Sequence, residues 1–278
     1  MDRLELKTED VAAAASYVHL SALLEGYTTG ERAIGFDLPC AQFLVRNLAY
    51  FHAISNQIFS TKKIKPHLSD FIFPVDESGT ENLIKALEGV LKENDKCIPY
   101  LDRMKELTRQ PMLKTAHEPF ATMIHNDYWV NNMMLKFENG KPIANKMVDF
   151  QVIEYKCPSR DLIFFLFSSV QQKVLEGHLD ELIDLYYESL IEKLEELKCD
   201  TSPFTRDLFE ERLKQAVVEA EYHHINIMLF PILAEASDIK ELSDISADDL
   251  KKGNEISPAL KERLLYVTLE CIRKGWLD

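Results

Sequence analysis

A short stretch near the middle of the chain carries polar residues at spacings that fit phosphoryl transfer. Asn132 follows Asp127 by five residues, and Asp149 follows Asn132 by seventeen. Phosphoryl transfer in kinases needs a carboxylate that orients the acceptor hydroxyl, and an Asn and an Asp that hold magnesium against the phosphates. Mg²⁺ prefers hard oxygen ligands of this kind. We therefore predict Asp127 and Asn132 as catalytic residues, and Asn132 and Asp149 as ligands of Mg²⁺.

A predicted hairpin would bring these residues together. Asn139-Gly140 lies between two apolar runs, and Asn-Gly in this setting is the strongest short-range hairpin signal. A hairpin folds the chain back on itself, so we expect Asn132 to lie close to Asp149.

An iron site could use part of the same stretch. His125-x-Asp127 with the distant His178 formally matches the two-histidine, one-carboxylate triad of non-haem iron. His178 precedes a predicted helix, and the spacing of Asn132 and Asp149 would then be unexplained, so we favour the magnesium site. Three other histidines are expected to be partly buried polar residues on helices: His52, His223 and His224.

The motif resembles the ecdysteroid kinase-like (CHK kinase-like) family, relatives of choline kinases and aminoglycoside phosphotransferases. The resemblance rests on three clusters in order: His125-x-Asp127-x-Trp129-x-x-Asn132-x-Met134, Asp149-Phe150-Gln151, and Asp161-Leu162. The family usually has Gly where Asn126 stands. Other similar segments extend the resemblance from about residue 24 to the end: Gly26-Tyr27, Gly35-Phe36-Asp37, Leu48-Ala49-Tyr50-Phe51-His52-Ala53 and Lys274-Gly275-Trp276-Leu277.

The resemblance implies a fold and an activity. The fold is α+β and mainly helical, the C-terminal lobe of a protein-kinase-like fold. The activity is ATP- and Mg²⁺-dependent phosphorylation of a hydroxyl on a small-molecule alcohol, of which steroid-like alcohols such as ecdysteroids are the implied class.

The resemblance also suggests roles for residues around the motif. It implies that the Asp161 carboxylate pins the catalytic loop, although an acid at the start of a helix can equally be a plain N-terminal charge. We interpret His125 as a structural imidazole bonded to nearby backbone. Trp129 and Gln151 are possible substrate contacts. Three apolar side chains are expected in the core: Trp129, Met134 and Phe150.

The phosphate-binding parts of a complete kinase are not found. Such kinases use a Gly-rich loop and a strand-borne Lys. No two of the nine glycines are two apart, and the P-loop spacing of Gly30 and Gly35 lacks the Lys-Ser/Thr that must follow. We therefore assign residues 1–36 to a remnant of the inter-lobe hinge and linker, and 37–278 to a kinase-like C-terminal lobe. A truncated gene, an isoform or a faulty gene model would each produce such a chain.

A second interpretation comes from another functional class. The chain would be a non-catalytic binding module for a small apolar alcohol or a partner protein. With either interpretation, we expect the 278-residue chain alone to bind ATP·Mg²⁺ weakly and to turn over little or nothing, because no Gly-rich loop and Lys position the γ-phosphate. The apolar surface that normally meets the N-terminal lobe would also favour self-association.

The composition excludes several classes of protein. The 278 residues carry a net charge of −14, which argues against binding to nucleic acid or to an anionic membrane. The five cysteines are scattered and odd in number, as in a cytoplasmic protein with reduced thiols and no zinc site. We find neither a signal peptide nor an apolar run of membrane-spanning length, so we expect a cytoplasmic protein.

Hydrophobic periodicity predicts helices on both sides of the hairpin. Asp37 should cap one helix, Pro231 should break another and Gly275 should stop the last. The predicted helices span residues 8–25, 37–59, 83–91, 161–170, 179–197, 205–227 and 258–274. Irregular segments are expected at residues 28–35, 62–79 and 244–255.

Overall fold

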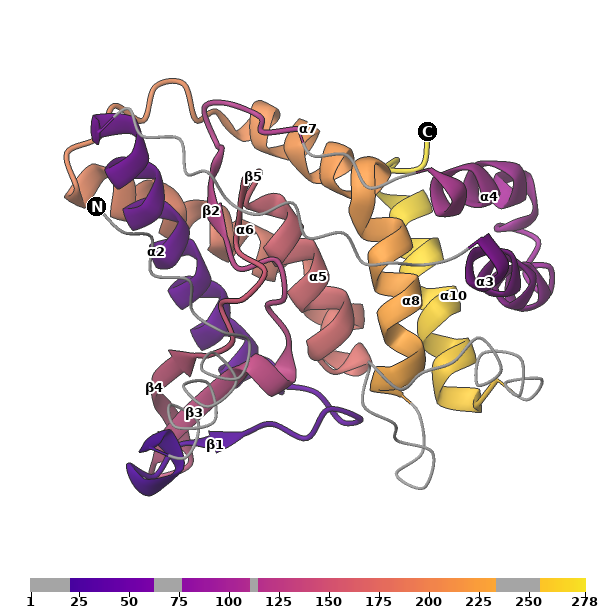
Figure 1. Ribbon diagram of the computed structural model, residues 1–278, viewed down its shortest axis with the longest axis horizontal. Helices are drawn as coiled ribbons and strands as arrows, with labels where there is room; N and C mark the ends of the chain where they lie inside the picture. The colour runs from indigo at the N-terminus through magenta and orange to yellow at the C-terminus, as the bar shows by residue number, and fades with distance from the viewer. Residues whose placement is uncertain (1–20, 63–76, 111–114, 234–255) are drawn as a thin grey trace, which may run out of the picture.

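Helices make up most of the molecule (Figure 1). The computed structural model describes residues 21–62, 77–110, 115–233 and 256–278. The α-helices in these ranges are α2 (Leu38–Lys62), α3 (Glu77–Leu91), α4 (Leu101–Arg109), α5 (Ser159–Ser169), α6 (Gln172–Glu196), α7 (Arg206–Ala216), α8 (Tyr222–Ile232) and α10 (Pro258–Arg273). A short 3-10 helix, η1 (Ile98–Tyr100), precedes α4, and a π-helical segment, η3 (Val217–Glu221), joins α7 to α8.

Two small antiparallel sheets complete the described fold. The first has the strand order β1 (Thr28–Thr29), β3 (Met133–Glu138), β4 (Lys141–Met147), and the second pairs β2 (Thr122–Ile124) with β5 (Glu154–Lys156). The predicted hairpin is confirmed as β3–β4. Its turn residues Asn139 and Gly140 both have positive φ, 51° and 75°, as in a type I′ turn, which Asn-Gly favours. The predicted α+β, mainly helical class is therefore confirmed.

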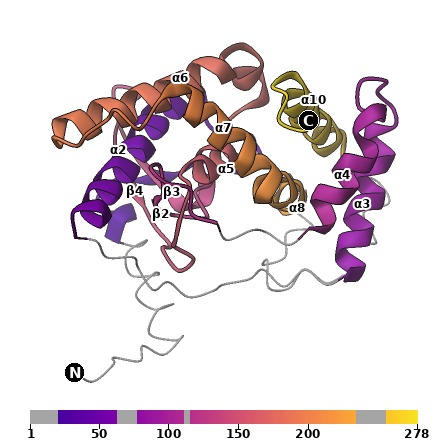
Figure 2. The same cartoon turned by 90° about the horizontal axis from the view of Figure 1, so that it is seen from above.

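Helix α5 is the centre of the core. All of its residues are buried, because a helix that is apolar on nearly every side must be covered all round. It contacts α6, α7, α8 and η3, while α2 packs along α6 (Figure 2). The Phe165 ring of α5 lies 6.1 Å from the Phe36 ring and 5.2 Å from the Tyr128 ring. The β1–β3–β4 sheet and the α3–α4 pair lie at opposite ends of this core (Figure 1).

The segment before α2 is attached to the end of α5. The Phe36 N–H donates to the Ser169 carbonyl at 2.7 Å, and the Gln171 N–H donates to the Phe36 carbonyl at 3.0 Å. Gly35 has a φ of +76°, and a Cβ there would lie 2.7 Å from the Ser169 carbonyl oxygen. Only glycine fits this conformation and this close approach. The segment predicted to be irregular, residues 28–35, is thus held in place, and it also contains the two-residue strand β1.

Several predicted helix ends are confirmed. The Asp37 carboxylate accepts a hydrogen bond from the Cys40 N–H at 3.1 Å at the start of α2, which satisfies one of the unpaired amides of a first helical turn. Gly275 has a φ of 66° and follows Lys274, the C-cap residue of α10, which is the usual left-handed end of a helix. The predictions for residues 8–20, 63–76 and 244–255 lie outside the described residues.

Other helix predictions were wrong in their bounds. Helix α6 begins at Gln172, so His178 lies inside a helix and not before one. The predicted break near Pro231 agrees with α8, which ends one residue later at Ile232. A proline inside a helix removes one backbone hydrogen bond, and its ring clashes with the carbonyl four residues earlier. The π-helical segment η3, within the predicted range 205–227, was not predicted. Residues 77–79 belong to α3. Helix α4 was not predicted, although Leu101, Met104 and Leu107 recur at helical spacing. Strands β2 and β5 have three residues each and are too short to give a periodic signal.

Two sequence-level expectations concern the whole chain. All five cysteines lie in the described ranges and are free thiols, as expected. Among the helices that the structure describes, none is both long and apolar enough to cross a membrane.

Candidate active site

The predicted site residues gather at the loop between β2 and β3, here called the central loop (residues 125–132). Strand β2 ends at Ile124, and a 3-10 turn, η2 (Val130–Asn132), leads into β3. Asn126 has a φ of 64°, a left-handed conformation that Asn tolerates better than most residues. The chain therefore turns sharply at the position just before Asp127.

Asp161 holds the start of the central loop through two backbone amides. Its Oδ2 accepts from the His125 N–H at 2.6 Å, and its Oδ1 accepts from the Asn126 N–H at 2.8 Å. The Asp161 side chain is only 1% exposed, so water does not compete with these charge-assisted bonds. The carboxylate thus makes the contact expected of a residue that pins the loop.

The His125 side chain joins the central loop to the residue before Asp149. Its Nε2 lies 2.9 Å from the Val148 carbonyl oxygen, and because a carbonyl only accepts, Nε2 carries the proton. The buried imidazole thus contacts backbone, which is the contact expected of a structural histidine.

Asp127 and Asn132 are in direct contact. The Asn132 Nδ2 donates to the Asp127 Oδ2 at 2.8 Å and to the Asp127 carbonyl oxygen at 2.9 Å. Both partners are acceptors, so the amide nitrogen must face Asp127, and the amide oxygen is left for another ligand. The five-residue spacing between Asp127 and Asn132 therefore places the two side chains in contact at the end of the central loop.

Asp149 lies just beyond the far strand of the hairpin. Met133 pairs with Met147, and the Val148 N–H donates to the Asn132 carbonyl at 3.0 Å. The pairing brings Asp149 beside the Asn132 end of β3, as predicted. Asp149 has a φ of 64°, and non-glycine residues held in this region are enriched at functional sites.

The geometry agrees with a comparison of the sequence with protein families. Residues 15–199 match the sequence model of the ecdysteroid kinase-like family. The chain belongs to the ecdysteroid kinase-like family. No curated protein matches the chain. Membership supports a kinase-like phosphotransferase, and the matched range contains the whole central loop together with Asp149 and Asp161.

The carboxyl of Asp127 in this ecdysteroid kinase-like protein has an altered proton affinity. Burial raises the pKa of Asp127 above its ordinary value, and the negative charge of Asp149 adds to this effect. The charges of His224 and His125 and the hydrogen bond from Asn132 act in the opposite direction. A carboxylate with a raised pKa accepts a proton more readily than an exposed one does.

Two oxygen donors suit magnesium. They are the free amide oxygen of Asn132 and the carboxylate of Asp149, whose Oδ2 also lies 3.4 Å from the Gln151 Nε2. Within the described ranges, no group of three or more His, Cys, Asp or Glu side chains is placed to hold a metal ion. Mg²⁺ is commonly held by one or two protein oxygens and completed by water and substrate phosphates, so a pair of donors fits it.

The alternative iron triad is not assembled. His178 lies on α6, where its Nδ1 is 2.7 Å from the Glu181 carboxylate. The Nε2 of His125 is occupied by the Val148 carbonyl. The two histidines therefore serve separate local contacts.

The apolar and substrate-contact predictions have mixed outcomes. Met134 and Trp129 are buried as expected, with Trp129 7% exposed. Phe150 was predicted in the core but is 40% exposed. It lies just outside the hairpin with its ring 4.7 Å from the His125 ring, so it covers the edge of the core. Gln151 is exposed, and it is the more accessible of the two proposed substrate contacts.

A buried ionic network contributes to the electrostatics of the site and was not predicted. The Glu221 carboxylate accepts from the Arg160 Nε at 2.7 Å and lies 3.1 Å from the His224 Nδ1. The His224 ring stacks on Phe164 with centroids 4.2 Å apart. Burial alone would raise the pKa of Glu221, but Arg160 and His224 bring it below its ordinary value. Glu221 ends the π-helical η3, and such segments often occur at functional sites.

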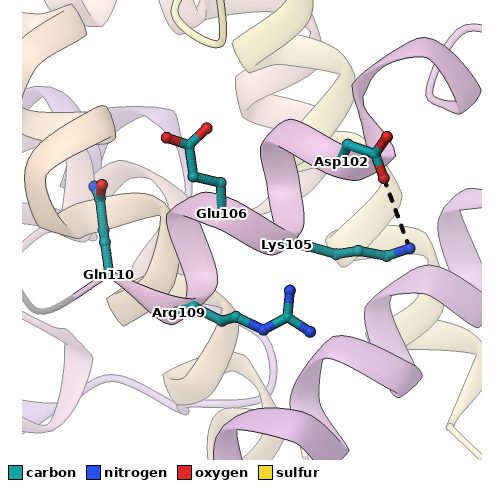
Figure 3. Close-up of a pocket in the computed structure, with 5 residues that line it drawn as sticks. All are labelled: Asp102, Lys105, Glu106, Arg109 and Gln110. Atoms are coloured by element: carbon teal, nitrogen blue, oxygen red, sulfur yellow. Dashed lines mark ion pairs between the residues drawn. The ribbon is translucent and has the colours of Figure 1, made fainter.

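A surface hollow on α4 is separate from this site. Figure 3 shows its lining residues: Asp102, Lys105, Glu106, Arg109 and Gln110. Its basic side chains are paired with acids of α3, Lys105 with Glu88 and Arg109 with Glu81, each at 2.8 Å. None of the lining residues belongs to the motif.

Proposed function

We propose that this ecdysteroid kinase-like protein transfers the γ-phosphoryl group of ATP to the hydroxyl of a small-molecule alcohol, in a Mg²⁺-dependent reaction. The proposal is carried by one observation: the contact between Asp127 and Asn132, with Asp149 at the neighbouring strand end. A carboxylate, an amide oxygen and a second carboxylate are then available within one short segment.

Asp127 is the residue proposed to act on the acceptor. It orients the hydroxyl toward the phosphoryl group and receives its proton as the bond to phosphorus forms. Its raised pKa favours that transfer. In a loose phosphoryl-transfer transition state, most of the catalysis comes from such positioning.

Asn132 and Asp149 are proposed to hold the Mg²⁺·phosphate unit. Bound Mg²⁺ supplies positive charge to the phosphates, which a chain with a net charge of −14 does not offer in bulk. Asn132 serves twice in this arrangement. Its amide nitrogen fixes the Asp127 carboxylate, and its amide oxygen would be a ligand of the metal.

The acceptor is proposed to be a steroid-like alcohol of the ecdysteroid class, by analogy with the family. Gln151 is exposed beside Asp149 and is the proposed polar contact for the acceptor. Trp129 is largely buried, so we propose that its indole supports the central loop and offers only an edge to the substrate.

A transfer assay with the full chain tests this function. Labelled ATP, Mg²⁺ and a panel of ecdysteroids, sterols, choline-like and sugar alcohols would be compared with reactions that lack the acceptor. We expect slow but Mg²⁺-dependent transfer to at least one alcohol; it should be slow because no Gly-rich loop or phosphate-binding Lys is found in the sequence. In Asp149→Asn we expect a further loss of about a hundredfold or more, because a carboxylate ligand of the metal is removed. Asp102→Asn is the matched control, since Asp102 is fully exposed on α4. Transfer by Asp149→Asn at the wild-type rate, or no transfer to any alcohol, contradicts the proposal.

A further inference from the structure

A histidine outside the motif completes the support of the central loop. His52 lies on α2 and is fully buried. Its Nε2 is 3.1 Å from the Asp161 Oδ2, and its Nδ1 is 2.7 Å from the Tyr186 hydroxyl of α6. Asp161 in turn accepts the amides of His125 and Asn126. A continuous chain of hydrogen bonds therefore runs from α6 through α2 to the start of the central loop.

The proton positions in this chain follow from the partners. The Asp161 carboxylate accepts, so the proton of His52 lies on Nε2. Burial raises the pKa of the Tyr186 phenol well above its ordinary value, so Tyr186 keeps its proton and donates it to Nδ1. Each polar atom of the chain then has a partner, as buried polar groups require.

The backbone of His52 is held by a side chain of the neighbouring strand β2. Its carbonyl oxygen accepts from the Thr122 Oγ1 at 3.0 Å, and Thr122 is the first residue of β2. The His52 ring also meets the Tyr186 ring edge-on, with centroids 5.9 Å apart. The imidazole therefore has little freedom to turn away from Asp161.

We propose that His52, held by Tyr186, is a positioning residue for phosphoryl transfer. It keeps both oxygens of Asp161 aimed at the two loop amides, and through them it fixes Asp127. This inference rests on the proposed function. Three donors now fix the orientation of the Asp161 carboxylate. With the His52 donor removed, a buried anion would rely on the two loop amides alone and could rotate or admit water.

Two conservative variants separate the halves of the imidazole. The amide nitrogen of Gln reaches roughly where Nε2 lies, so His52→Gln keeps the donor to Asp161 and loses the partner of Tyr186. The shorter Asn reaches only the Nδ1 position, so His52→Asn keeps the contact to Tyr186 and loses the donor to Asp161. Tyr186→Phe removes a single hydroxyl and is the mildest of the three changes.

The readout is amide hydrogen exchange, measured by NMR on the full chain without ATP or acceptor. In His52→Asn we expect the amides of His125 and Asn126 to exchange about tenfold faster relative to the amide of Phe209 in α7, which corresponds to one lost hydrogen bond to a charged group. His52→Gln should restore exchange close to the wild-type rate. In the transfer assay, kcat should fall in His52→Asn while KM for ATP stays near the wild-type value.

Equal acceleration at all three amides would show a merely structural role and overturn the inference, as would unchanged exchange at His125 and Asn126. If His52→Asn does not fold, Tyr186→Phe decides in the same way. Relative to the wild-type protein, a larger acceleration of exchange at the two loop amides than at the Phe209 amide supports the inference, and an equal change at all three overturns it. Exchange does not depend on turnover. A wild-type chain that transfers no phosphate would therefore overturn the proposed function while leaving the exchange result to judge the chain of hydrogen bonds.

Discussion

Asp161 and Asp127 are both carboxylates of the central loop region, but their surroundings differ. Asp161 is 1% exposed, and its two oxygens accept three hydrogen bonds, from two backbone amides and His52. Asp127 is partly exposed, and its carboxylate accepts from Asn132. The pKa of Asp127 is raised by burial that its partners only partly offset.

The difference shows how one site can combine a structural carboxylate, on α5, with a reactive one, in the central loop. A buried charge that is fully hydrogen-bonded is costly to remove, because its donors are then left unpaired. A carboxylate with few donors is less stable in its charged form, and that remaining proton affinity is useful for accepting a hydroxyl proton. Proteins often accept such local instability at functional sites.

Removal of Asp161 should have the largest effect on stability. In Asp161→Ala, two backbone amides and His52 lose their shared acceptor inside the core. We expect a loss of about 4 kcal/mol in the free energy of unfolding, because three buried donors are left without an acceptor, together with a loss of phosphoryl transfer. Denaturant unfolding measures the change, with Asp102→Ala as the exposed control. If activity is lost while the melting temperature stays the same, Asp161 acts directly in the chemistry and the contrast with Asp127 fails.

His223 should give a smaller change in stability. It is buried like His52, but among the described residues no carboxylate forms a hydrogen bond with either of its ring nitrogens. Burial, aided by the charge of His224, lowers the pKa of His223 to about 4. Between pH 6.5 and 4 the unfolded chain takes up a proton at this position and the folded chain does not, so stability is lost as the pH falls. From pH 7 to 4.5 we expect His223→Gln to lose about 2 kcal/mol less stability than the wild-type protein. Parallel pH profiles for the two proteins would show that His223 does not contribute.

The local half of the site could be predicted from the sequence. Asn139-Gly140 specifies a turn that sets the register of β3 and β4, and this register brings Asp149 next to Asn132. The fixed spacing of Asp127 and Asn132 does the same within one loop. These contacts depend on neighbours in the chain, so short-range patterns are enough to find them.

The supporting half could not be predicted, because it depends on how distant helices pack. His52 and Asp161 are 109 residues apart and meet only because α2 and α5 share a core. Glu221 reaches Arg160 from a π-helical segment, which has no periodicity signal of its own. Phe150 was misplaced for a related reason: its apolar side chain predicts burial, but the end of the hairpin leaves it at the edge of the core.

The smallest change in stability is expected at Asp127, and its variant tests the account most directly. Asp127→Asn keeps the shape of the side chain and removes a charge whose pKa is raised in the folded protein. Because a raised carboxyl pKa means that the charged form opposes folding at neutral pH, the variant should be as stable as the wild type or slightly more stable. Phosphoryl transfer measured on the same samples should fall about a hundredfold or more, since the group that receives the proton is lost. Near-normal transfer by a fully folded Asp127→Asn would contradict the assignment of Asp127 as the reactive carboxylate of the central loop.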